Sequence, residues 1–76
     1  MASMKIVPNP MTAGGTAEIV TDLPAGTVIN LDWDPSGGVK TVTVGTNGRA
    51  QFDVPRGAGS VIATSGTASA AATHGP

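Results

Sequence analysis

Residues 45–55 read GTNGRAQFDVP, and this stretch decides the fold class. The dipeptide Asn47-Gly48 favours a tight hairpin turn, because both residue types tolerate positive φ angles. Apolar and polar residues then alternate over residues 49–54, which is the pattern of a half-buried strand. Its inward side chains are Ala50, Phe52 and Val54. Pro55 ends the strand because it has no N–H for a sheet ladder. The stretch therefore predicts a strand that returns from an Asn-Gly hairpin.

The same pattern of short strands and turns extends along the rest of the chain. Eleven glycines and six prolines separate short runs that are rich in Val, Ile and Thr. The alternation is sharpest over residues 28–34, where Ile29, Leu31 and Trp33 share one side. We predict strands over residues 5–8, 16–23, 28–34, 39–44, 49–54, 60–64 and, as a possible seventh, 67–73 with Ala68, Ala70 and Ala72 inward. Six or seven short strands of this kind predict an all-β protein, either a small antiparallel β-sandwich or a small barrel. Because one face of each strand is apolar and the other polar, we favour the sandwich.

The length of 76 residues allows one small domain. We expect residues 1–15 to form an extended N-terminal arm with a first short strand, and residues 16–73 to form the sandwich. Residues 74–76 are expected to be a frayed tail, because chain ends commonly fray. The single histidine, His74, falls in this tail.

The composition argues against several classes of function. The chain has no cysteine, which excludes disulfides and thiolate metal sites. Four Lys and Arg residues are scattered among five Asp and Glu residues, so no basic footprint for nucleic acid or anionic lipid is present. No long apolar run follows Met1, and we expect no membrane span, no secretory signal and synthesis in a cytoplasm. With no nucleophile motif and no histidine outside the tail, we expect no enzyme and no cofactor.

Three groups of residues in the strands are candidates for small sites. Asp32 and Asp34 share a strand face and, with Asp22 or Asn30 nearby, have ligand atoms suited to Ca²⁺, but we favour the interpretation that they are charges that keep this face solvated. Trp33 is either a core anchor or a platform for a sugar or a partner, and its alternation with Ile29 and Leu31 favours the core. The outward threonines form a possible hydroxyl array, which β-propensity alone also explains; they are Thr27, Thr41, Thr43 and Thr46.

Three surfaces are candidates for binding a partner. The first is the arm over residues 1–10, which has the extended character needed to add a strand to a partner. The second is the pair of loops over residues 35–38 and 56–59. The third is the final strand, an edge without charged residues. The residues that we expect to contact a protein partner are Lys5, Ile6, Val7, Pro8, Arg49 and Arg56.

Three stretches together resemble the bacterial immunoglobulin-like domain family. They are LPAGTVINLDWDPSG at residues 23–37, VGTNGRAQFDVP at 44–55 and GAGSVIATSGTASAAAT at 57–73. The resemblance covers residues 16–73. Two features depart from the family pattern: no aromatic residue lies at residues 60–62, and no cysteine pair frames Trp33. The resemblance implies an immunoglobulin-like β-sandwich that serves as a recognition or spacer module, and it carries over no catalytic residues.

The resemblance also implies a setting for the protein. Free-standing members without a signal are well represented among tailed-phage virion proteins. We therefore expect a capsid decoration (cement) protein on the virion surface, bound to the major capsid protein or another virion protein, with homo-oligomers on the particle as an option. One alternative is a carbohydrate- or cell-surface-binding module of a larger secreted protein, and another is a spacer domain with no ligand.

Overall fold

The structure is a computed structural model, and it describes residues 3–35 and 37–75. These residues form strands β1 (Met4–Val7), β2 (Thr16–Thr21), β3 (Val28–Asp34), β4 (Thr41–Thr43), β5 (Arg49–Asp53), β6 (Gly59–Ser65) and β7 (Ala68–His74). The described ranges contain no helix, so the prediction of an all-β protein is confirmed. It follows that they hold no helix long and apolar enough to cross a membrane.

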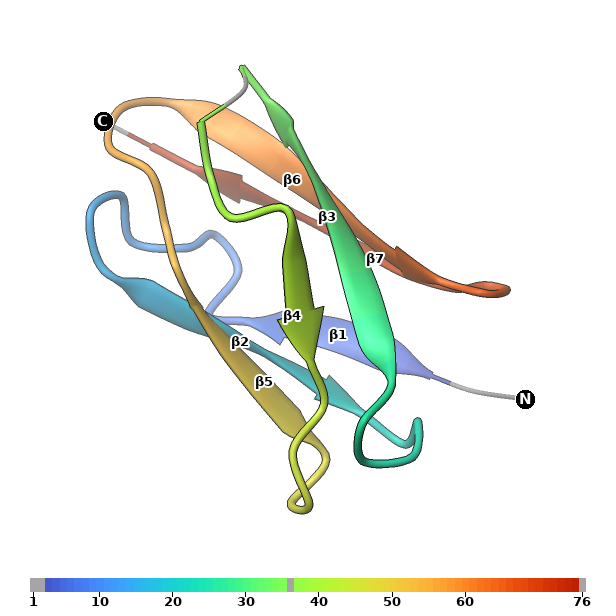
Figure 1. The fold of residues 1–76 in the computed structure, drawn as a ribbon. Coiled ribbons are helices and arrows are strands. Elements are labelled where there is room, and N and C mark those ends of the chain that lie inside the picture. Colours follow the sequence, from blue (N-terminus) through green and yellow to red (C-terminus); the bar gives the residue numbers. More distant parts are fainter. Residues whose placement is uncertain (1–2, 36, 76) are drawn as a thin grey trace.

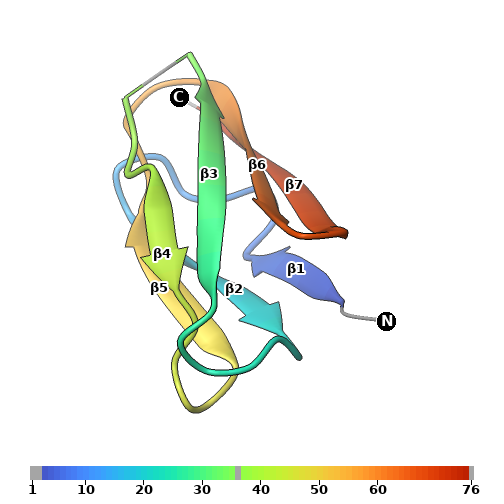
Figure 2. The same cartoon turned by 45° about the vertical axis from the view of Figure 1, so that its right-hand side comes forward.

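The strands form two antiparallel sheets that face each other as layers (Figures 1 and 2). The three-stranded sheet has the order β1-β2-β5, and the four-stranded sheet has the order β4-β3-β6-β7. Consecutive strands often lie in different sheets: the chain crosses between layers after β2, after β4 and after β5. This is the arrangement of a β-sandwich, in which each sheet covers one side of a shared core.

The core is built from the inward side chains of both sheets. The three-stranded sheet contributes Ile19 and Phe52, while the four-stranded sheet contributes Ile29 and Val61, and all four are at most 4% exposed. The inward positions predicted from alternation are confirmed at Ala50, Phe52, Val54, Ile29, Leu31, Trp33, Ala68 and Ala72, all of which are buried. Period-two alternation thus identified the buried face correctly, because successive side chains in a strand point to opposite faces.

The turn at residues 45–48 differs from the predicted hairpin. The Gly48 N–H donates to Gly45 O at 3.1 Å, and the Gly45 N–H donates to Arg49 O at 2.9 Å, so the chain does reverse tightly. Within this turn Gly48 is the residue with a positive φ angle, 75°. Asn47 has none, because no non-glycine residue in the described ranges has a positive φ angle. Asn47 instead accepts a hydrogen bond from the Arg49 N–H through Oδ1 at 3.1 Å.

The prediction that the strands on either side of this turn pair with each other is wrong. The two strands leave the turn for different sheets: β4 pairs with β3, and β5 pairs with β2. These pairings begin directly beside the turn. The Val44 N–H donates to Thr27 O at 2.9 Å, and the Thr21 N–H donates to Gly48 O at 2.9 Å. A local turn signal specifies a reversal of the chain, but long-range contacts decide which strands become neighbours.

Much of the predicted arm is part of the sandwich. Residues Met4–Val7 pair with β2 over four positions, and Ile6 is only 4% exposed. The chain then crosses to the other sheet, where the N–H of Met11 donates to Thr73 O at 2.7 Å and its side chain is buried. Residues 4–11 are therefore held by both sheets, and Ile6 and Met11 belong to the shared core. Residues 1 and 2 lie outside the described residues.

The expected frayed tail is wrong at His74. This residue ends β7, is 5% exposed, and places Nδ1 2.6 Å from Gly57 O. Its ring also meets the ring of Trp33 edge-on, with centroids 5.8 Å apart. The alternation that buries Ala68 and Ala72 continues to His74, so the side chain points inward and closes that end of the core.

Candidate binding surface

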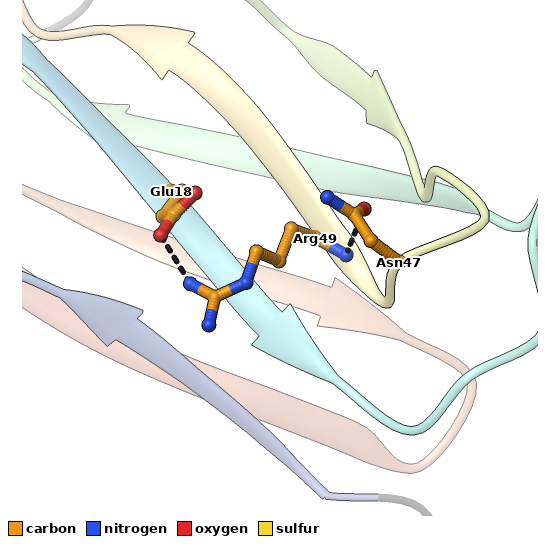
Figure 3. Close-up of polar contacts among 3 residues, drawn as sticks. All are labelled: Glu18, Asn47 and Arg49. Carbon is orange, nitrogen blue, oxygen red and sulfur yellow. Dashed lines mark hydrogen bonds and ion pairs between the residues drawn. The ribbon is translucent and has the colours of Figure 1, made fainter.

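Three of the residues expected to contact a partner lie on the outer face of the three-stranded sheet. Lys5 lies opposite Val20, Val20 lies opposite Arg49, and Val7 lies opposite Glu18. The Arg49 guanidinium forms an ion pair with Glu18 across the sheet (Figure 3). The Arg49 and Glu18 side chains are 48% and 34% exposed, so water screens the pair, and such pairs typically contribute about 0–1 kcal/mol. Arg49 is thus already paired within its own sheet.

The other three expected residues do not join this group. Ile6 is in the core and reaches no partner while β1 stays in its sheet. Pro8 is exposed just after β1. Arg56 is exposed in the connection between β5 and β6, where its Cγ lies 3.3 Å from the point that a Cβ on Gly14 would occupy. The six residues therefore do not form one surface.

The two loops expected to form a surface do lie at the same end of the sandwich. Asp34, the last residue of β3, is paired with Ser60 of β6. The loop that follows β3 therefore begins beside the point where the loop before β6 ends. The approach is close, because a Cβ on Gly59 would lie 2.7 Å from Asp34 O. Ser36 belongs to the first loop and lies outside the described residues.

Trp33 is a core anchor and not a binding platform. Its side chain is 8% exposed, its Nε1 donates to Val39 O at 2.7 Å, and its ring meets Phe52 edge-on with centroids 5.8 Å apart. Gly38 lies against the indole so closely that a Cβ would fall 2.3 Å from ring atoms. A buried indole needs a partner for its N–H, and the Val39 carbonyl supplies one.

Asp32 and Asp34 point to solvent from β3, as expected for alternate residues of one strand. Across the sheet they face Ile62 and Ser60, neither of which is a carboxylate. Within residues 3–35 and 37–75, no three His, Cys, Asp or Glu side chains gather closely enough to hold a metal ion. The two aspartates are charges on an open face.

The outer face of the four-stranded sheet is the surface that the sequence did not reveal. Its outward side chains are Val28, Asn30, Asp32, Asp34, Thr41, Thr43, Ser60, Ile62, Thr64, Ser69, Ala71 and Thr73. Only the two aspartates in this set are charged. Near its middle Ile62 is 49% exposed, between Asp32 on one side and Ala71 on the other. We call this set of residues the four-stranded face.

One sequence signal for this face was available. In β6 the residues Val61 and Ala63 are buried, so Ile62 is the apolar residue on the side where the alternation predicts a polar one. An exposed isoleucine alone is ordinary on protein surfaces. It becomes informative only when the register places it inside an area with few charges.

No protein-family model, curated protein or solved structure matches this chain. The geometry of the two outer faces is therefore the basis for a functional proposal.

Proposed function

We propose that this protein is a non-enzymatic structural protein that decorates a virion, docking on the capsid through its four-stranded face. The observation that carries the proposal is the half-exposed Ile62 in an area whose side chains are small and nearly all uncharged. Depletion of charge is what distinguishes the centre of a protein interface from the rest of a surface.

The two aspartates of the face add a charge requirement to the partner. Asp32 lies next to Ile62, and Asp34 follows it near the end of β3. Opposite charges across an interface favour the correct partner and the correct register. The capsid surface that receives this face should therefore present an apolar site for Ile62 and a Lys or Arg near Asp32.

The strand order supports an immunoglobulin-like module. Constant-type immunoglobulin domains place their strands, in chain order, as 1-2-5-4 against 3-6-7 and bury a tryptophan on the third strand. The present order is 1-2-5 against 4-3-6-7, with Trp33 buried on β3. The difference is that β4 pairs with β3 instead of β5.

The placement of His74 supports the non-enzymatic part of the proposal. A serine or threonine nucleophile needs a base within hydrogen-bond reach. The one histidine of the chain is buried between Trp33 and Gly57, and its Nδ1 is engaged by the Gly57 carbonyl. The His74 side chain therefore points into the core, on the opposite side of β7 from the hydroxyls of the four-stranded face.

Particle fractionation tests the proposal directly. Virions from the source culture are purified on a density gradient, and this protein is quantified by mass spectrometry along the gradient. We expect it to peak with the major capsid protein and to withstand dilution. Its absence from intact particles, while it is found free in the lysate, would contradict the proposal.

A second candidate function is binding of carbohydrate on a cell surface. The observation that favours it is a row of polar side chains across the four-stranded face, Thr41, Asn30, Thr64 and Ser69. The buried state of Trp33 argues against it, since sugar rings are commonly bound by stacking on exposed aromatic rings. Binding to glycan arrays together with absence from virions would favour this second function.

A further inference from the structure

The four edge strands of the sandwich differ in how they are protected against pairing with other chains. Exposed edges carry unpaired backbone groups, and natural proteins protect them with charges, prolines, short strands or covering segments. The edge strand β4 is only three residues long, and β1 has four residues, one of them Lys5. The edge strand β5 carries Arg49 and Asp53 at its two ends. Each of these three edges has one of the usual protections.

Strand β7 is long and uncharged, and hydrogen bonds from other segments cover only its second half. It has seven residues, and residues 68–73 read ASAAAT. The Met11 N–H donates to Thr73 O at 2.7 Å, and Asn9 Nδ2 donates to Ala71 O at 3.3 Å. No hydrogen bond from the described part of the chain reaches the outer side of β7 before Ala71. Strand β1 of the other sheet lies close to β7, but in the described part of the chain the first half of β7 has no charged residue, no proline and no hydrogen-bonded covering segment.

We propose that a second copy of this chain pairs antiparallel with the first half of β7, with a two-fold axis at Ser69. The carbonyls of Ala71 and Thr73 point away from β6, and in an antiparallel ladder this direction alternates along the strand. The N–H and C=O of Ser69 therefore point outward as well. Around this axis Ser69 faces Ser69 of the second copy, and Ala71 faces Thr67 of the second copy, which takes the place of the Asn9 side chain at the Ala71 carbonyl.

The position of the axis follows from what already covers β7. An axis at Ala70 would place Thr67 of the second copy beside Thr73, where Met11 already hydrogen-bonds. Moving the axis to Ser69 brings the hairpin turn of the second copy to that place, so its chain turns away before the crowded segment. The side chains that meet are Ser, Ala and Thr, which leave neither bulk nor like charges in contact. A symmetric pair of this kind is self-complementary and closes without further growth.

The consequence of this pairing is a continuous eight-stranded sheet in which two four-stranded faces form one surface. The inference does not depend on the virion, because self-pairing rests on β7 alone. A ladder of about five residues a side buries much less surface than the ~800 Å² that each partner buries in a standard interface. Self-association should accordingly be weak in dilute solution and become evident in concentrated solution.

Cysteine cross-linking tests the position of the axis. The chain has no cysteine, so a single Ser69→Cys substitution reports on one site. Facing residues of a hydrogen-bonded pair have Cα atoms about 5.5 Å apart, which is within the range for a disulfide. We expect Ser69→Cys to form a disulfide-linked dimer under mild oxidation much faster than Gln51→Cys, the matched variant at an exposed position on the edge strand β5. Equal rates for the two variants would overturn the inference.

Sedimentation over a concentration series tests the pairing without oxidation. The wild-type chain should shift toward a dimer at high concentration. Ser69→Lys places two like charges face to face and should remain a monomer with an unchanged circular dichroism spectrum. A wild-type chain that stays monomeric in concentrated solution would overturn the inference, as would a Ser69→Lys variant that associates like the wild type.

Discussion

The two outer faces of the sandwich cover the same core but differ in their charge. In the three-stranded sheet Val20, on the central strand, lies between Lys5 and Arg49. In the four-stranded sheet Ile62, also on an interior strand, lies between Asp32 and Ala71. One apolar side chain is thus bordered by two cations, and the other by one anion and one methyl group.

This difference in charge is not needed for folding, because the core is formed by side chains on the inner faces of the two sheets and not by those on the outer faces. Charged residues keep the three-stranded face wet and oppose its burial in an interface, since they lose hydration there. The four-stranded face has little hydration to lose. Outward residues that contribute little to stability can therefore determine which face is suited to docking.

The largest expected effect comes from deleting residues 1–9. The deletion removes β1, its ladder to β2 and the Ile6 side chain from the core. Truncating a single buried Ile to Ala typically costs about 2–5 kcal/mol, so loss of the whole strand should unfold a domain of this size. Thermal unfolding followed by circular dichroism measures the effect.

Lys5→Ala is the control for the deletion, because it removes an exposed side chain from the same strand and should unfold near the wild-type temperature. A deletion variant that unfolds cooperatively at the wild-type temperature would show that β1 is an independent arm. It would also show that Lys5 and the rest of β1 are not a fixed part of the outer face of the three-stranded sheet.

The next largest effect is expected for Gly38→Ala, which acts beneath the four-stranded face. The new methyl group would lie 2.3 Å from the Trp33 ring, so the indole must move within a packed core. Overpacking of this kind costs about 1–3 kcal/mol. At about 4–8 °C per kcal/mol for a domain of this length, the unfolding temperature should fall clearly.

Gly75→Ala is the matched control, because nothing lies within 4 Å of the added Cβ. If both glycine variants unfold at the wild-type temperature, the packing of Gly38 against Trp33 is not as tight as the structure shows.

Sequence alternation predicted the fold well because burial follows a period of two in strands. It placed Ile29, Leu31 and Trp33 in the core, and all three are buried. It could not predict that β4 and β5 separate, since the turn at Gly48 looks the same whether its flanking strands pair or part. The burial of His74 was not predicted, because chain ends commonly fray. In the structure the alternation of buried and exposed residues in β7 continues to His74.

The candidate surface was less predictable than the fold. The outward direction of Arg49 was expected and is observed, but its ion pair with Glu18 depends on the register of β2 against β5. The four-stranded face likewise exists only through register, which brings Ile62 between Asp32 and Ala71. Residues so far apart in sequence share a surface through long-range pairing, which local patterns do not specify.

A smaller effect is expected for the ion pair on the three-stranded face. Arg49→Ala, Glu18→Ala and the double variant form a cycle that measures the coupling between the two side chains. We expect a coupling of about 0.2–1 kcal/mol that decreases in high salt, because both groups are partly exposed. A coupling well above this range and unchanged by salt would mean that water does not screen the pair, and would contradict the interpretation of this face as a hydrated surface.

The smallest effect on stability, and the largest on binding, is expected for a matched pair of charge substitutions. Ile62→Lys places a cation beside Asp32, and Val20→Glu places an anion between Lys5 and Arg49. Each new charge faces an opposite charge on a neighbouring strand, and such pairs contribute about 0.2–1 kcal/mol. Both variants should therefore fold as stably as the wild type.

Rebinding of these two variants to virions stripped of the wild-type protein tests the choice of face most directly. We expect Val20→Glu to bind like the wild type and Ile62→Lys to bind at least about tenfold more weakly, a loss of about 1.4 kcal/mol. Wild-type binding by Ile62→Lys together with lost binding by Val20→Glu would contradict the proposal and assign docking to the three-stranded face.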